Sequence, residues 1–135
     1  MKDTPDLTPP SLEEIRSTAA AIAPYVDRTP VQRWRGPELD SRMGADTQVH
    51  LKLELFQRTG TFKARAAVNN VLALTAEQRS RGVTTVSAGN HAIATAYAAA
   101  CFGAHAKVVM LASANPARVE AARRYGAEVV LAPDG

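Results

Sequence analysis

The chain has 135 residues, the size of one domain with a moderate hydrophobic core, and its 46% hydrophobic and 21% charged content is ordinary for a globular protein. Its net charge is only +3 and its basic residues are scattered, which argues against a nucleic-acid-binding protein. The single cysteine excludes an intramolecular disulfide, and the three histidines lack the spacing of metal ligands. No apolar run is long enough to span a bilayer, and residues 1–10 do not resemble a signal peptide, so we expect a cytoplasmic protein with no membrane partner.

The spacing of apolar residues predicts helices and strands that alternate along most of the chain. Residues 1–10 are expected to form a flexible tail, and the capping-box pattern of Ser11 and Glu14 predicts a helix that begins at Leu12 and ends at Pro24. The elements expected after it, in chain order, are extended chain at 28–31, a short helix at 37–43, a strand at 47–55, helices at 61–74 and 75–81, a strand at 83–86, a helix at 90–102, a strand at 107–111, a helix at 116–125 and a strand at 128–131. Strands that alternate with helices over short loops indicate an α/β fold with βα units and a parallel sheet.

One lysine, Lys63, stands between the strand expected at 47–55 and the helix that follows. Its amine is therefore expected in the first turn of a helix, where exposed N–H groups and the positive end of the helix dipole disfavour a positive charge. Arg58 and Arg65 add like charge nearby, which favours the neutral, nucleophilic amine. The chemistry that most needs such an amine is Schiff-base formation with an aldehyde. The alternative for any single lysine is an ordinary solvent-exposed side chain.

A second junction between a strand and a helix has the sequence Ser87-Ala88-Gly89-Asn90-His91. Small and polar residues at such a turn leave N–H groups at the start of the helix free to bind an anion, for example a carboxylate. The alternative is structural, with Asn90 capping the helix and Gly89 making the turn. A nucleophilic amine and an anion site at two such junctions are a more specific combination than either is alone.

These two segments resemble the motifs of a known enzyme family. Residues 53–65, Leu-Glu-Leu-Phe-Gln-Arg-Thr-Gly-Thr-Phe-Lys-Ala-Arg, resemble the pyridoxal-phosphate lysine motif of the threonine and serine dehydratases, and residues 87–92 resemble the substrate-carboxylate loop of the same family. The resemblance extends from about Leu12 to the last residue. It implies the N-terminal portion of the fold type II, or tryptophan-synthase-β-like, architecture. We therefore expect residues 11–84 to belong to the large cofactor domain, as its N-terminal arm and lysine helix, and residues 85–135 to the small α/β domain.

The resemblance also implies roles for individual residues. Lys63 would bind pyridoxal 5'-phosphate covalently and later move the α-proton of the substrate, Phe62 would pack near the cofactor ring, and Asn90 would hydrogen-bond the phenolic oxygen of the cofactor. The substrate carboxylate would be bound, mainly through backbone N–H groups, by Ser87, Gly89, Asn90 and His91. The implied reaction is β-elimination, in which L-threonine or L-serine gives a 2-oxo acid and ammonia. Members of the family are commonly dimers or tetramers, so a homo-oligomer is compatible with this assignment.

Some features of the sequence depart from the family pattern. Ala88 stands where serine racemases carry a serine that acts as a second acid/base, and an alanine side chain moves no proton, which favours elimination over racemisation. Family members are more than twice as long as this chain, and their glycine-rich phosphate loop has no counterpart in its sequence. The alternatives are therefore a noncatalytic remnant or small-molecule-binding module of the same fold, or a relative of the serine racemases or hydroxyaspartate dehydratases.

Overall fold

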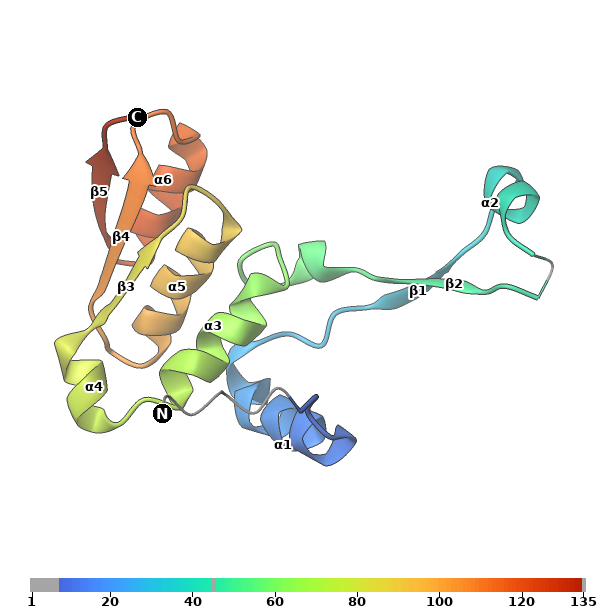
Figure 1. Cartoon of the computed structure of the whole chain (residues 1–135), viewed down its shortest axis with the longest axis horizontal. Coiled ribbons are helices and arrows are strands. Elements are labelled where there is room, and N and C mark those ends of the chain that lie inside the picture. The colour runs from blue at the N-terminus through green and yellow to red at the C-terminus, as the bar shows by residue number, and fades with distance from the viewer. Residues whose placement is uncertain (1–7, 45, 135) are drawn as a thin grey trace, which may run out of the picture.

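The computed structural model describes residues 8–44 and 46–134, which form an α/β body and a projecting arm (Figure 1). The helices of the described residues are α1 (Leu12–Ile22), α2 (Pro37–Arg42), α3 (Lys63–Leu72), α4 (Ala76–Arg81), α5 (Asn90–Cys101) and α6 (Pro116–Arg124), with 3-10 turns η1 (Ala23–Tyr25) and η2 (Glu54–Phe56). The strands are β1 (Val31–Trp34), β2 (Val49–Lys52), β3 (Val83–Val86), β4 (Ala106–Leu111) and β5 (Glu128–Ala132). The body contains α1, α3 to α6 and β3 to β5, and the arm contains β1, α2 and β2.

The body is built on a three-stranded parallel sheet with the order β3-β4-β5. Buried and more exposed residues alternate along the central strand, with Ala106, Val108 and Met110 buried. This alternation is expected when helices cover one face of a sheet, and here the covering helices are α5 and α6. The predicted α/β class with a parallel sheet is confirmed.

Helix α5 lies at the centre of the body because it packs in two directions. Its residues Ala92, Ala96 and Ala99 face the sheet, while Ala94 and Ala98 belong to a second core formed with α1 and α3. Small side chains let neighbouring elements approach the helix closely on both sides, which accounts for the alanine-rich sequence of this segment. The second core also contains residues of the other two helices and of the turn after α1: Ile22, Val26, Ala67, Val68 and Val71.

The prediction was wrong for the segment 47–55. Only Val49–Lys52 forms a strand, and it pairs antiparallel with β1, which overlaps the extended chain expected at 28–31 only at Val31. The next residues form the turn η2, in which the Glu54 carboxylate accepts hydrogen bonds from Thr29 and Arg65. The side chains of this ribbon are almost all exposed in the described structure, and Figure 1 shows it extending away from the body.

Most other predicted boundaries agree with the structure to within one or two residues. The capping boxes of Ser11 with Glu14 and of Thr75 with Gln78 are both formed, and Asn115 caps α6. The expected tail at 1–10 falls mainly outside the described residues, and residues 8–10 have no regular structure. Within the described ranges, no helix has the length and apolar character needed to cross a membrane.

Candidate active site

Lys63 is the first residue of α3, at the position that the sequence predicts for it. Among the described residues its ammonium makes no hydrogen bond or ion pair, and its recorded contact is with the ring of Phe62, whose centroid lies 5.1 Å from Nζ. The side chain of Phe62 is 57% exposed, so one face of this pair is accessible. An amine without an acidic partner at a helix start is available to react with an aldehyde.

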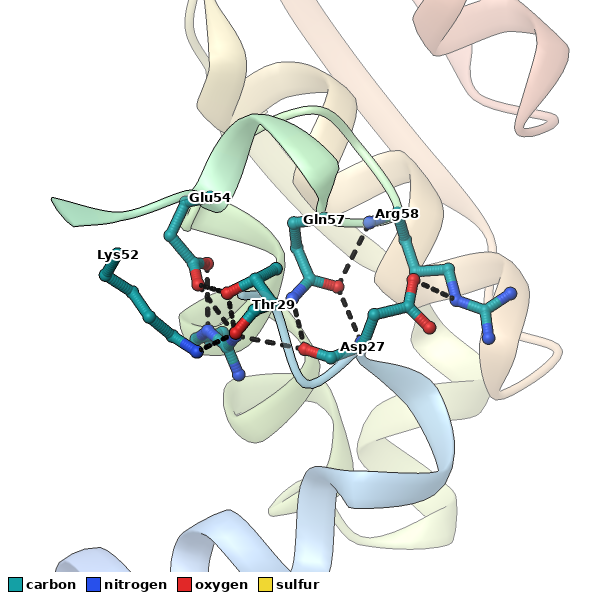
Figure 2. A network of polar contacts seen from close by, with 7 residues as sticks. Asp27, Thr29, Lys52, Glu54, Gln57 and Arg58 are labelled. Carbon is teal, nitrogen blue, oxygen red and sulfur yellow. Dashed lines mark hydrogen bonds and ion pairs between the residues drawn. The ribbon is translucent and has the colours of Figure 1, made fainter. Parts of the chain in front are cut away.

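The loop before Lys63, residues 57–62, is called the lysine loop here. It begins at Gln57, whose buried side chain forms hydrogen bonds with the backbone of a distant segment (Figure 2). Its amide oxygen accepts hydrogen bonds from the N–H groups of Asp27 at 2.9 Å and Arg58 at 3.0 Å, and its Nε2 donates to the Asp27 carbonyl at 2.9 Å. Arg58 also forms an ion pair with the Asp27 carboxylate, with Nε 3.0 Å from Oδ2. These contacts fix the start of the lysine loop against residue 27.

A second group of contacts surrounds the Glu54 carboxylate, which is mostly buried. Arg65 donates to both of its oxygens, from Nε at 2.9 Å and from Nη2 at 2.8 Å, and the Thr29 hydroxyl donates to it at 2.5 Å. The hydrogen bond from Arg65 is the main reason that the pKa of Glu54 lies below its usual value, and desolvation opposes this shift. In Figure 2, Glu54, Thr29 and Lys52 lie together, and Lys52 Nζ donates to the Thr29 carbonyl at 2.6 Å.

Two hydroxyl groups in the lysine loop are buried and have no partner among the described residues, namely Thr59 Oγ1 and Thr61 Oγ1. A buried polar atom without a partner is uncommon, and such atoms are often paired with a water molecule or a ligand. The sequence analysis did not single out either residue. The signal for them was the short polar run Thr-Gly-Thr directly before Phe62 and Lys63.

The second junction forms the start of α5, and here the structure contradicts the purely structural alternative for Asn90. The residue that caps α5 is Gly89, and Asn90 is the first helical residue, with no capping hydrogen bond from its side chain. Gly89 has φ of −130°, which other residues also adopt, so the turn does not require glycine for its backbone conformation. A Cβ at this position would lie 3.5 Å from Nη1 of Arg118, which is an ordinary van der Waals contact.

The backbone of this junction offers free hydrogen-bond donors. The Gly89 N–H donates to the Ser87 hydroxyl at 3.2 Å, and the Ser87 N–H donates to the Val109 carbonyl at 3.0 Å. The N–H groups of Asn90 and His91 have no acceptor among the described residues, as expected for the first turn of a helix. Among the described residues, the donors open to an anion are therefore those of Ala88, Asn90 and His91, while the N–H groups of Ser87 and Gly89 are already engaged.

The fold packs the helices that follow the two junctions against each other. Helices α3 and α5 pack together along their lengths, and Figure 1 shows them side by side with their first turns toward the side from which the arm extends. His91 at the start of α5 shares a pocket of about 210 Å³ with Ala67 and Asn70 of α3. The helices that carry the lysine and the anion-binding turn are thus packed against each other.

Comparison with known proteins identifies the family. The model of a family described as pyridoxal-phosphate-dependent enzymes matches residues 22–135. The chain belongs to this family. The resemblance to the fold type II dehydratases is confirmed at this level, and the cofactor of the family is pyridoxal phosphate.

Individual relatives of this pyridoxal-phosphate family member are enzymes of related kinds. A phenylserine dehydratase from Ralstonia pickettii is 51% identical over 128 residues, which are 95% of this chain and 38% of that protein. A catabolic L-threonine dehydratase from Staphylococcus aureus is 40% identical over 121 residues, which are 90% of this chain and 34% of that protein. The structure of maize serine racemase superposes with a TM-score of 0.81 at 38% identity and covers 93% of this chain and 37% of that one. The chain thus spans little more than a third of the length of these relatives.

The residues present fit pyridoxal phosphate. Its aldehyde requires an amine without an acidic partner, which Lys63 provides among the described residues. The orphaned hydroxyls of Thr59 and Thr61 and the free N–H groups of Asn90 and His91 are donors that suit an anionic cofactor and an amino-acid carboxylate.

Proposed function

We propose that the chain carries the lysine and the substrate-carboxylate site of an enzyme that eliminates water from a β-hydroxy amino acid to give an enamine, which water then hydrolyses to a 2-oxo acid and ammonia. The observation that carries this proposal is the unpaired amine of Lys63 at the start of α3, a helix that packs against α5, whose first turn has free N–H groups. One element supplies a nucleophile and a proton carrier, and the other supplies a site for the carboxylate that every α-amino acid has.

Each residue has a defined task in this proposal. The N–H groups of Asn90 and His91 bind the substrate carboxylate, and the hydroxyl of Ser87 holds the Gly89 N–H so that the turn keeps its shape. The Lys63 amine binds the cofactor and accepts the proton from the α-carbon of the substrate. When bound, pyridoxal phosphate acts as an electron sink for the negative charge that develops at that carbon.

The side chains of Asn90 and Phe62 serve the cofactor in this proposal. The Asn90 amide is free of capping contacts, so it is available to donate to the phenolic oxygen of the cofactor. The ring of Phe62 is exposed beside the lysine, which suits packing against the cofactor ring. Both assignments follow from the resemblance of the two motifs.

Elimination is favoured over racemisation, although serine racemases are among the relatives. Racemisation needs a second group that delivers a proton to the opposite face of the α-carbon. In this chain that position carries Ala88, whose side chain has no exchangeable proton. Because the relative that is 51% identical to this chain is a phenylserine dehydratase, phenylserine should be tested as a substrate together with threonine and serine.

The direct test is to add pyridoxal phosphate to the purified chain, reduce it with borohydride and map the labelled peptides. We expect saturable labelling at Lys63, with a visible absorbance that is lost in Lys63→Ala. Lys107→Ala is the matched control, because this lysine is exposed and paired with Glu128 at 2.8 Å. Equal labelling of all lysines would refute the role of Lys63. Assays for 2-oxo acids from L-threonine, L-serine and phenylserine then test the reaction, and a labelled chain without turnover would favour a noncatalytic binding module.

A further inference from the structure

The guanidinium of Arg65 holds the helix that carries Lys63 to a segment more than 30 residues earlier in the chain. Besides its two contacts with Glu54, its Nη2 donates to the Asp27 carbonyl at 3.1 Å and lies 3.5 Å from the Thr29 hydroxyl. Arg65 stands two residues after Lys63 in α3, so the same first turn of the helix contains both side chains. The positive charge of Arg65 is balanced by the Glu54 carboxylate, with which it forms an ion pair.

Side chains at both ends of the lysine loop donate hydrogen bonds to the same backbone carbonyl, that of Asp27. The Asp27 carbonyl accepts from Gln57 Nε2 at the start of the loop at 2.9 Å and from Arg65 Nη2 just beyond its end at 3.1 Å. Between these points the chain makes a tight turn, in which Gly60 has φ of 71° and its N–H donates to the Gln57 carbonyl at 2.7 Å. The position of the loop relative to the body is therefore fixed at both ends by the same backbone atom.

We propose that Arg65 is a positioning residue, which sets the place of Lys63 by holding the first turn of α3 against the Asp27 carbonyl and the Glu54 carboxylate. It acts through the loop and the helix and touches no reacting atom. The inference rests on the proposed function of Lys63. Arginine is suited to this task because its planar fork contacts two carboxylate oxygens and a carbonyl at once, whereas the ammonium of lysine offers no such fixed geometry.

The test compares Arg65→Lys and Arg65→Met with wild type and with Arg124→Met. The control variant removes an arginine from another Arg–Glu pair, which lies on the exposed surface of α6 with Nε 3.4 Å from Glu120. Two quantities are measured under conditions where every variant is folded. The first is hydrogen–deuterium exchange of the amides of Arg58 and Gly60, and the second is the borohydride-trapped labelling of Lys63 by pyridoxal phosphate relative to that of Lys107.

We expect Arg65→Lys, which keeps the charge, to speed exchange of the two loop amides by about tenfold relative to amides of β4, because local opening of the loop becomes easier. The preference for labelling Lys63 over Lys107 should fall several-fold in the same variant, and Arg124→Met should change neither quantity. A purely structural arginine would alter the denaturant midpoint while leaving both ratios unchanged, and that result would overturn the proposal. If Arg65→Met fails to fold, Arg65→Lys alone decides between these outcomes.

Failure of the proposed function gives a different result. If the wild-type chain shows no preference for Lys63, the assignment of the cofactor lysine fails, while the exchange rates still report whether Arg65 holds the loop. If wild type labels Lys63 and both Arg65 variants label it equally well, the positioning role fails and the proposed function stands. Loop amides that exchange in wild type as fast as in an unfolded peptide would also overturn the proposal.

Discussion

Replacement of Gln57 tests whether the lysine loop is fastened as the structure indicates. The Gln57 side chain is 4% exposed and makes three hydrogen bonds of 2.9 to 3.0 Å, all to backbone groups of Asp27 and Arg58. In Gln57→Ala, the two N–H groups lose their acceptor and the Asp27 carbonyl keeps only its contact with Arg65. Each such bond contributes about 1 kcal/mol net, and each buried donor left without a partner costs about 1 to 3 kcal/mol.

Because water can reach some of the exposed groups, we expect Gln57→Ala to lower the free energy of unfolding by about 2 to 4 kcal/mol. Urea unfolding followed by far-UV circular dichroism measures this change, and an unchanged slope with denaturant shows that the midpoint reports stability. Gln32→Ala is the matched control, since its side chain is exposed on β1 and forms no hydrogen bond with the described residues. Its effect should stay within about 0.5 kcal/mol. A Gln57→Ala chain as stable as Gln32→Ala would refute the argument that this side chain fastens the loop.

Two further predictions concern the same region and the sheet. The pKa of Glu54 is lowered in the folded chain, so the stability due to its pair with Arg65 is present at neutral pH and is lost as the pH falls through the folded pKa, below about 4.5. Glu54→Gln should remove this part of the pH dependence, as measured by urea unfolding between neutral and acidic pH. Gly82 has φ of 83°, and a Cβ there would lie 2.7 Å from the carbonyl oxygen of His105, so Gly82→Ala should destabilise the chain by more than about 1 kcal/mol in thermal unfolding. Gly36→Ala is the control, because no atom lies within 4 Å of its added Cβ, and an equal effect of the two substitutions would contradict this explanation.

The parts of the fold that the sequence predicted depend on local signals. The capping residues Ser11, Thr75 and Asn115 each contact a residue no more than three positions further along the chain. These local contacts were predicted, and all three caps are formed. The βα units after residue 83 are short and regular, so apolar spacing located them well. The same kind of local pattern predicted Lys63 in the first turn of its helix, although the helix begins at Lys63 and not at the expected residue 61.

The parts that the sequence did not predict depend on contacts between distant residues. Pairing of β1 with β2 joins segments about 20 residues apart, and an isolated ribbon of two strands has no strong pattern of its own. The contacts of Gln57 and Arg65 with Asp27 span 30 and 38 residues. In the sequence, Gln57 and Arg65 are recognised only as parts of the lysine motif. The structure is needed to show which backbone groups they contact. The catalytic and binding roles of Lys63 and the α5 turn remain predictions.

The proposed chemistry has two requirements, which are the placement of Lys63 and the exclusion of water from the site. In the proposal, the placement of Lys63 depends on contacts of Gln57 and Arg65 with Asp27 and Glu54, which are all described residues, so variants of this chain can test it directly. Exclusion of water is different, because Phe62 is 57% exposed and Val86, next to the carboxylate turn, is 81% exposed. Expelling water from an active site strengthens the electrostatic interactions inside it and prevents side reactions. Under the proposed function, labelling of Lys63 should therefore depend less on shielding from water than turnover does.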